Sequence, residues 1–445
     1  MIKRLLFIAF ILGLGQVFII YALKNISQLL SPERFALFGQ VESNFQFLII
    51  LIAAGILSDA IRRIAQTNDW EKEYVNYQSA RIFFSFLITP LALLCFIDKS
   101  YIIFLIAPVI GLSGEYAFYG VGKPIQGAII AFVRIIVPYG ISILVARLAP
   151  QYFLELFIML LVVTYFFTGY IIAGILNTRF FIKPSINHFR LYFTSFKLGI
   201  INISIYIQGL GLLLLIPLLF KDDFLMISAA FLSLKFYAIY KSVIRIIHQA
   251  LVREMLHLKH CLTVDKLTML LGFTFLAAVL IFPKSAITLL FGDQYLIATP
   301  LIQLIGLTCV IFSICFSLGT NAILINFENR LLFICLLSVG LCVLSLFLYS
   351  LLLPGFYAIG LALLTGEVSL AAGLLYMYQQ HKIIPPRLFS VLQNSLCLGI
   401  PLLFKTIFLS DSLQGMLLSV GCYSLVIFLL NLKEFNAVTL TKTQY

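Results

Sequence analysis

Long apolar runs separated by short polar segments extend along the whole sequence. A helix that crosses about 30 Å of hydrocarbon at 1.5 Å per residue needs about 20 apolar residues. The pattern predicts about fourteen transmembrane helices, at residues 5–24, 37–58, 80–97, 101–121, 125–147, 152–176, 198–220, 224–247, 268–290, 299–325, 331–353, 356–379, 389–409 and 412–432. These runs are too continuous for the alternating strands of an outer-membrane barrel. We therefore expect an all-α polytopic membrane protein.

The second apolar run ends in an acid and two adjacent arginines, within the stretch 55–65. If the region is one helix, a single stripe holds Gln40, Asn44, Leu51, Gly55, Ser58 and Arg62, because their separations are near-multiples of 3.6. A hydrophobic helix with a polar stripe and a basic end is typical of the wall of a polar path through a membrane. The alternative for Arg62 and Arg63 is an anchor at the membrane interface. We interpret Arg63 as such an anchor.

Several ionisable and amide side chains lie inside the predicted spans, where a charge costs a few kcal/mol and needs a reason. They are Glu42, Asn44, Glu115, Arg134, Lys235, Asn321 and Glu367. Arg134 lies more than two turns from the start of its span, so its side chain cannot easily reach the interface. It could bind a ligand, or it could only neutralise Glu115 or Glu155. Polar stripes of Ser and Thr could likewise serve only to join helices.

The composition agrees with a membrane protein, since 62% of residues are hydrophobic and 11% are charged, against about 25% charged in a soluble domain. Lys and Arg gather in the segments that lie on the same side as the N-terminus. The positive-inside rule then predicts that both termini are cytoplasmic. The net charge of +12 is spread over many short loops, which argues against nucleic-acid binding. No metal-ligand spacing or phosphate-binding loop is evident, so we expect neither a metal nor another cofactor.

Two sequence echoes predict two similar halves. Ala60-Ile-Arg-Arg-Ile64 closes the second helix of the first six, and Val243-Ile-Arg-Ile-Ile247, which contains Arg245, closes the second helix of the next six. Parallel repeats of this kind place a binding site between the halves. We expect an N-terminal lobe at 1–176, a cytoplasmic amphipathic linker at 177–197, a C-terminal lobe at 198–380, and two further helices with a cytoplasmic tail at 381–445.

Several short motifs resemble those of the polysaccharide transporters, the Wzx-type oligosaccharide-lipid flippases of the multidrug/oligosaccharidyl-lipid/polysaccharide (MOP) superfamily. Leu30-Ser-Pro-Glu-Arg-Phe35 resembles the family's L-G-P-E-x-F, and 55–65 resembles its G-L-x-x-A-x-x-R-x-x-A. Residues 115–123 resemble P-E-W-x-x-Q-G-x-x-K, although Gly114 replaces the proline and Tyr119 the glutamine. Leu290-Phe-Gly-Asp-Gln-Tyr295 and 353–362 resemble two further motifs. The resemblance covers essentially the whole chain through the order of these pieces.

The resemblance implies two six-helix lobes around a central cavity, in a multi-pass protein of the bacterial cytoplasmic (inner) membrane. It implies transport of an undecaprenyl-pyrophosphate-linked glycan to the outer leaflet by alternating access, with a glycan polymerase and a chain-length regulator as further partners. A diphosphate favours arginines, whose planar fork binds two phosphate oxygens together. We therefore expect the cavity to use Arg62, Arg134, Arg245, Lys235, Asn44 and Asn321. Glu115, Glu42 and Glu367 are the candidates for coupling to a proton or sodium ion.

Three other classes of protein compete with this interpretation. A peptidoglycan-precursor flippase or a multidrug exporter would belong to the same superfamily, although bases at membrane depth argue against a cation exporter. A membrane glycan polymerase or glycosyltransferase would be an enzyme. The short outer loops offer no place for its chemistry, so we expect a transporter and not an enzyme.

Overall fold

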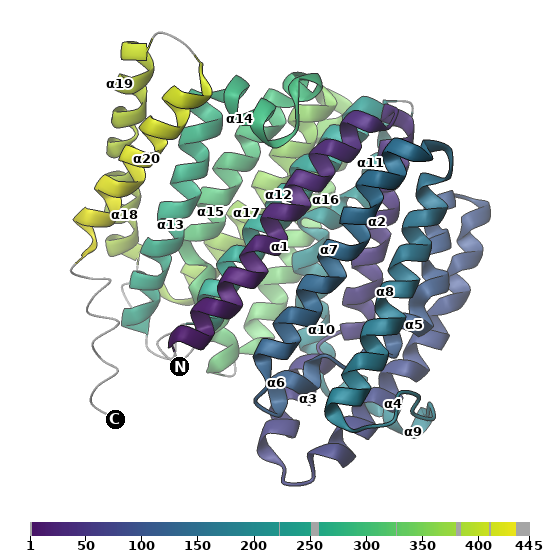
Figure 1. Cartoon of the computed structure of the whole chain (residues 1–445). Coiled ribbons are helices and arrows are strands. Elements are labelled where there is room, and N and C mark those ends of the chain that lie inside the picture. The colour runs from purple at the N-terminus through teal and green to yellow at the C-terminus, as the bar shows by residue number, and fades with distance from the viewer. Residues whose placement is uncertain are drawn as a thin grey trace. The chain divides into compact units, whose positions relative to one another are not determined.

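Helices are the only regular secondary structure in the computed structural model, which describes residues 2–221, 223–250, 258–325, 327–379, 384–408 and 411–432 (Figure 1). The chain divides into two compact units. Unit 1 consists of Met1–Ile207 and Leu213–Pro217, and unit 2 consists of Gln208–Leu212 and Leu218–Tyr445.

Twelve helical segments of the described chain are long and apolar enough to cross a membrane. The pair Phe196–Ile207 and Leu210–Leu219, bent by 71°, would form a thirteenth span. These findings confirm an all-helical, multi-pass membrane protein. The sides on which the two termini lie stay a prediction.

The helices of unit 1 are α1 (Ile2–Leu29), α2 (Pro32–Ala53), α3 (Ile56–Gln66), α4 (Trp70–Ile88), η1 (Thr89–Phe96), η2 (Lys99–Ile106), α5 (Ala107–Gly111), α6 (Tyr116–Gly120), α7 (Pro124–Leu148), η3 (Pro150–Tyr152), α8 (Phe153–Leu176), α9 (Ile186–Thr194) and α10 (Phe196–Ile207). After them come η4 (Leu210–Leu214) and α11 (Ile216–Leu219). Within unit 1, α1 packs along α7, α7 packs on α8, and α4 contacts α3, α5 and α9. The ring of Phe38 on α2 meets Phe153 and Phe157 of α8 edge-on, at 5.3 and 4.9 Å between centroids.

Polar caps fix where two of these helices begin. The Ser31 hydroxyl accepts a hydrogen bond from the backbone of Arg34 and starts α2. The Asp69 carboxylate accepts from the backbone of Lys72 and starts α4. Because α4 begins at Trp70, the span continues from there to Phe96, and the predicted start at residue 80 is wrong. Capping side chains satisfy backbone N–H groups that no helical carbonyl reaches.

The prediction of one continuous helix through 37–58 and on to Arg62 is also wrong. The second helix ends at Ala53, and Ala54 and Gly55 take positive φ angles of 26° and 77° before α3 begins. The residues from Gln40 to Arg62 therefore do not share one helix face, because α2 and α3 are two separate helices. A right-handed helix cannot continue through residues of positive φ.

The predicted span at 101–121 corresponds to a shorter apolar segment, Lys99–Gly111. A turn at 112–115 separates this segment from α6, so the predicted span is wrong in its second half. The turn contains Ser113, Gly114 and Glu115. Its carbonyls and side chains face neighbouring helices and become part of the site described below.

Unit 2 contains α12 (Phe224–Ala250), α13 (Leu258–Ile281), α14 (Pro283–Leu290), η6 (Asp293–Ala298), α15 (Thr299–Leu324), α16 (Glu328–Leu352), α17 (Gly355–Met377), α18 (Ile384–Cys397), α19 (Gly399–Phe408) and α20 (Leu413–Leu430). Its centre is built by α15, which packs against α12, α13 and α17, while α16 covers α17. The last helices, drawn in yellow-green to yellow, attach through α18 and α20 to α13 (Figure 1).

Asp411, just before α20, caps the distant helix α14. Its two carboxylate oxygens accept from the backbone N–H groups of Lys284 and Ser285, at 2.9 and 3.0 Å. No side chain next to α14 in sequence supplies this cap. We expect Asp411→Ala to cost about 1 kcal/mol of stability, measured as a lower thermal unfolding temperature with faster amide exchange in α14. Asp411→Asn keeps a carbonyl oxygen and should lose less. Equal losses in both variants would contradict the capping role.

Candidate functional site

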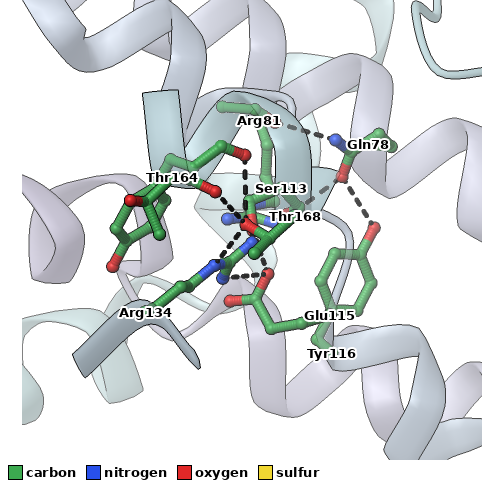
Figure 2. Close-up of polar contacts among 10 residues, drawn as sticks. Gln78, Arg81, Ser113, Glu115, Tyr116, Arg134, Thr164 and Thr168 are labelled. Carbon is green, nitrogen blue, oxygen red and sulfur yellow. Dashed lines mark hydrogen bonds and ion pairs between the residues drawn. The ribbon is translucent and has the colours of Figure 1, made fainter. Parts of the chain in front are cut away.

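Arg134 lies in α7 with its side chain buried, and its partners come from α8 and from the turn between α5 and α6 (Figure 2). Its Nε donates to the Thr168 hydroxyl at 2.9 Å, and its Nη2 donates to the Ser113 hydroxyl. Its Nη1 pairs with Glu115 Oε2 at 3.2 Å. The guanidinium also lies 4.4 Å from the ring centroid of Tyr165. Of the two predicted partners, the structure thus pairs Arg134 with Glu115.

The turn between α5 and α6 organises these contacts. The Ser113 hydroxyl donates to Glu115 and accepts from Arg134, while the Ser113 backbone carbonyl accepts from Arg81 Nη1 (Figure 2). A continuous helix would have used that carbonyl in its own hydrogen-bond ladder. Because the helix is interrupted here, the Ser113 carbonyl is available to accept a hydrogen bond from the buried Arg81.

Arg81, in the middle of α4, is the second base of this cluster and is 3% exposed. Besides the Ser113 carbonyl, its Nη1 contacts Gln78 Oε1 at 3.5 Å, and its guanidinium lies 5.1 Å from the centroid of the Tyr116 ring. Its Nε is buried without a hydrogen-bond partner in the described structure. Among the described residues, no carboxylate lies within ion-pair distance of Arg81.

The cluster of Arg81, Arg134 and Glu115 therefore carries one positive charge in excess. Guanidinium groups at membrane depth are costly and normally mark a ligand path or a paired charge. Here the described direct contacts of Arg81 are to neutral oxygens and an aromatic face, and the Glu115 carboxylate interacts with it from beyond ion-pair distance. The arrangement is suited to an anion with several oxygens, because each guanidinium presents donors in one plane.

Arg81 was not among the residues predicted from the sequence, because it directly follows the predicted start of its span at residue 80. Moving the helix start to Trp70 places Arg81 more than two turns inside α4. The cap residue Asp69 and the polar residues Gln78 and Ser79 before Arg81 were the available signals.

Two other predicted residues lie in α2 of the same unit. Glu42 is buried and accepts from the Tyr139 hydroxyl at 2.5 Å and from Gln46 at 3.3 Å. Asn44 is buried and donates to the Ser100 hydroxyl at 2.8 Å. Both side chains thus join α2 to neighbouring elements, and their predicted roles in ion coupling and glycan binding stay predictions.

Arg62 lies on α3, where its side chain is 67% exposed and pairs with Asp59 at 2.7 Å. Arg63 pairs with the same carboxylate at 3.3 Å, and the Tyr77 hydroxyl of α4 also donates to it. The structure brings Arg62 to Asp59 and not into the Arg134 cluster. Arg62 as a phosphate ligand stays a prediction.

Asp59 predicts a pH dependence of stability, since α3 lies outside the candidate spans. Burial raises the pKa of its carboxyl, but the Tyr77 hydrogen bond and the two arginines outweigh burial, so its pKa is lowered. A folded-state pKa below the unfolded value, about 3.9, gives stability that is present above pH 4 and lost as pH falls through the folded pKa. We expect Asp59→Asn to cost about 1.5 kcal/mol near pH 7. Denaturant unfolding should show this gap closing below pH 4, and a constant gap would contradict the ionic role.

The predicted residues of unit 2 occupy different places. Lys235 is buried in α12, and Asn321 is buried in α15, where its Oδ1 accepts from the Tyr378 hydroxyl at 2.7 Å. Arg245, near the end of α12, is exposed. Glu367 in α17 is buried and pairs with Lys241 of α12 at 2.6 Å. Lys241 was not among the residues predicted from the sequence, so this buried pair was not predicted.

A second buried ion pair joins the last helices to the rest of unit 2. Arg387 of α18 donates to Asp265 of α13 at 2.5 Å and to the Ile314 carbonyl of α15 at 3.1 Å. The other Asp265 oxygen accepts from the backbone of Ser317 at 3.2 Å. This pair also escaped the sequence analysis, because its partners are 122 residues apart.

Comparison with solved structures shows the same fold in known transporters. The lipid II flippase MurJ, in an inward closed conformation, matches with a TM-score of 0.70 and 15% identity, over 97% of this chain and 99% of its own. An inward-facing multidrug resistance MATE family transporter of the MOP superfamily matches with a TM-score of 0.61 and 13% identity, over 81% and 93% of the two chains. An outward-facing MATE family transporter gives 0.55 at 12% identity, over 85% and 95%.

Sequence comparison adds no closer assignment, since no family model matches the chain and no curated protein is significantly similar to it. The structural likeness shows the fold alone, and the superfamily that the motifs indicated and its oligosaccharide branch stay predictions. The chain thus has the fold shared by a lipid flippase and by multidrug transporters of the MOP superfamily.

Proposed function

We propose that this chain is a flippase that moves undecaprenyl-pyrophosphate-linked oligosaccharide repeat units from the inner to the outer leaflet of the cytoplasmic membrane by alternating access. The glycan would serve O-antigen, capsule or exopolysaccharide synthesis. The observation that carries the proposal is the excess positive charge of the Arg81, Arg134 and Glu115 cluster, inside a unit built of membrane-spanning helices.

A diphosphate matches the chemistry of this cluster. Arg134 already directs its donors to oxygen atoms of Thr168, Ser113 and Glu115. A phosphate oxygen can replace the Glu115 carboxylate in such a set, since both are anionic acceptors for a planar fork. Glu115 is the most accessible member, with 27% of its side chain exposed against 7% for Arg134. The substrate would therefore approach from the Glu115 side.

The second candidate is a flippase for a lipid-linked peptidoglycan precursor. Its support is the TM-score, which is higher for the lipid II flippase (0.70) than for the inward-facing MATE transporter (0.61). Both candidate substrates are lipid-linked and anionic, so the arginine cluster alone does not separate them. A multidrug exporter would need to bind compounds that are commonly cationic, which the excess positive charge in unit 1 opposes.

Reconstitution of the full chain into liposomes tests the proposal. Three substrates are compared under the same ion gradients: an undecaprenyl-pyrophosphate-linked oligosaccharide, lipid II and a cationic dye. Translocation of each lipid is measured as the fraction that becomes accessible to an impermeant enzyme acting on its glycan, with protein-free liposomes as the baseline. Faster translocation of the oligosaccharide lipid supports the proposal. Preference for lipid II would establish the second candidate, and transport of the dye alone would overturn both.

A further inference from the structure

Gln78 is a fully buried side chain of α4, and its amide joins the two helices on either side of the turn at 112–115. Its Nε2 donates to the carbonyl of Gly111, the last residue of α5, at 2.8 Å. Its Oε1 accepts from the hydroxyl of Tyr116, the first residue of α6, at 3.3 Å (Figure 2). The same oxygen accepts a long hydrogen bond from Arg81 Nη1, at 3.5 Å. One amide therefore holds the turn and contacts a base of the arginine cluster.

The neighbours of this amide fix the direction in which it faces. The Gly111 carbonyl can only accept and a guanidinium can only donate, so the nitrogen must face α5 and the oxygen must face Arg81. A leucine at this position would leave buried polar groups without partners, which is costly. A glutamate could accept from Arg81 and Tyr116, but its carboxylate could not donate to Gly111. The neutral amide satisfies all three neighbours together.

Close packing around the turn leaves this face of α4 little room to move. The face is formed by residues at spacings of four, three and four along the helix, namely Tyr74, Gln78, Arg81 and Ser85. A Cβ added at Gly111 would clash with the Ser85 hydroxyl, and one added at Gly114 would clash with the Tyr74 hydroxyl. The turn is thus fitted against this face, and Gln78 keeps Arg81 beside it.

Gln78 contacts Arg81 without changing the charge of the cluster. Arg81 is 3% exposed, and its Nε has no hydrogen-bond partner in the described structure. When a phosphate replaces Glu115, the two guanidiniums present two positive charges to it. A diphosphate esterified at both ends carries two negative charges, whereas a phosphodiester carries one. The buried Arg81, which has no ion-pair partner among the described residues, therefore matches the second phosphate.

We propose that Gln78 is a specificity-determining residue of the arginine cluster. It holds Arg81 at the turn and, as a neutral amide, leaves the charge of Arg81 to a second phosphate, so that the site selects a lipid diphosphate over a lipid monophosphate. A carboxylate at position 78 would instead pair with Arg81 and lower the charge offered to the ligand from two to one. The inference rests on the proposed function and deepens it, because it names the headgroup charge that the site selects.

Binding of two probes to the full chain in nanodiscs of zwitterionic lipid tests this selectivity. Both probes carry a farnesyl chain and a terminal methyl ester. One is a diphosphate diester and the other a phosphodiester. Calorimetric titration measures both affinities, with empty nanodiscs as the baseline. Wild type should bind the diphosphate more tightly.

The two substitutions at position 78 have different expected effects. Gln78→Glu should weaken diphosphate binding by about tenfold or more. It should weaken monophosphate binding much less, because the added charge repels two charges in one probe and one in the other. Gln78→Leu keeps the charge of the cluster but no longer holds Arg81, so it should weaken binding of both probes.

Gln303 of α15 offers a matched control in unit 2, since its Nε2 also donates to a backbone carbonyl, that of Val279, at 3.4 Å. Gln303→Glu should leave both affinities unchanged. If Gln78→Glu changes neither affinity, or lowers both by the same factor, the selectivity is not set at Gln78 and the proposal is overturned. If Gln78→Glu does not fold, Gln78→Leu decides, because unchanged affinities in that variant would overturn the holding of Arg81.

The probes carry no glycan and cross no membrane, so their binding is independent of the translocation assay. Diphosphate selectivity that depends on Gln78 in a chain that does not move the oligosaccharide lipid would overturn the proposed function and support this inference. Equal binding of the two probes by a chain that does move it would overturn this inference alone.

Discussion

Replacing Arg134 by Met is expected to stop glycan translocation and to lower the free energy of unfolding by about 3 to 5 kcal/mol. The loss is large because the variant leaves Glu115, Ser113 and Thr168 without the donors that now reach them from one guanidinium. An ionised Glu115 would then lie beside the membrane interior without its ion-pair partner. Denaturant unfolding in detergent measures the stability, and the liposome assay measures transport.

Arg147 offers a matched control on the same helix, since it is exposed near the end of α7. Arg147→Met should change stability by less than about 0.5 kcal/mol and leave translocation intact. If Arg134→Met unfolds no more easily than Arg147→Met, the buried cluster does not stabilise unit 1.

A second substitution separates folding from transport. Arg134→Met combined with Glu115→Gln removes both charges and should recover part of the stability, because no uncompensated carboxylate remains. Translocation should stay absent, because the double variant lacks the planar fork of Arg134 and leaves Arg81 as the one guanidinium of the cluster. Arg134→Lys keeps the charge but loses the planar fork. We expect it to fold better than Arg134→Met and to transport poorly.

The sequence predicted the parts of this protein that depend on hydropathy. Lipid excludes unpaired backbone groups, so long apolar runs must be helices wherever they occur. The pairing of Arg134 with Glu115 was one of its stated alternatives, because a deeply placed base needs a nearby acid. The substrate role of this pair, and the boundary between the lobes at 177–197, stay predictions.

Other features could not be predicted because they depend on distant neighbours. Periodicity placed Arg62 on a stripe with Asn44, but it assumed a straight helix through Gly55. The pair of Lys241 and Glu367 joins residues 126 apart in the sequence, and local pattern carries no information about such a partner. Arg81 was not recognised as a buried base, because its helix was predicted to start at residue 80 and starts at Trp70. A glycine followed by an amphipathic segment was the available signal for the break at Gly55.

The break at Gly55 predicts the second large effect. Gly55 has a φ of 77°, and a Cβ there would lie 2.6 Å from the Gly199 nitrogen and 2.6 Å from the Ser195 carbonyl oxygen. Both atoms belong to the backbone near the start of α10. Neither can move away from an added Cβ as the end of a flexible side chain could. The Tyr192 hydroxyl holds the same junction by donating to the Ile52 carbonyl at 2.7 Å. Gly55→Ala should therefore cost about 3 kcal/mol, combining an unfavourable φ with two clashes.

The chain offers glycines that separate the two causes. Gly199→Ala introduces a clash alone, since its Cβ would lie 2.6 Å from the Ala54 carbonyl oxygen. Gly122→Ala introduces the unfavourable φ alone, at 74° with nothing within 4 Å, and should cost about 1 to 2 kcal/mol. Gly174→Ala in α8 has neither problem and should be neutral or stabilising, because alanine favours helix. Thermal unfolding should rank Gly55→Ala below Gly199→Ala and Gly122→Ala, with Gly174→Ala at or above wild type. If Gly55→Ala were as stable as Gly174→Ala, α2 and α3 would have to form the continuous helix that the polar stripe required.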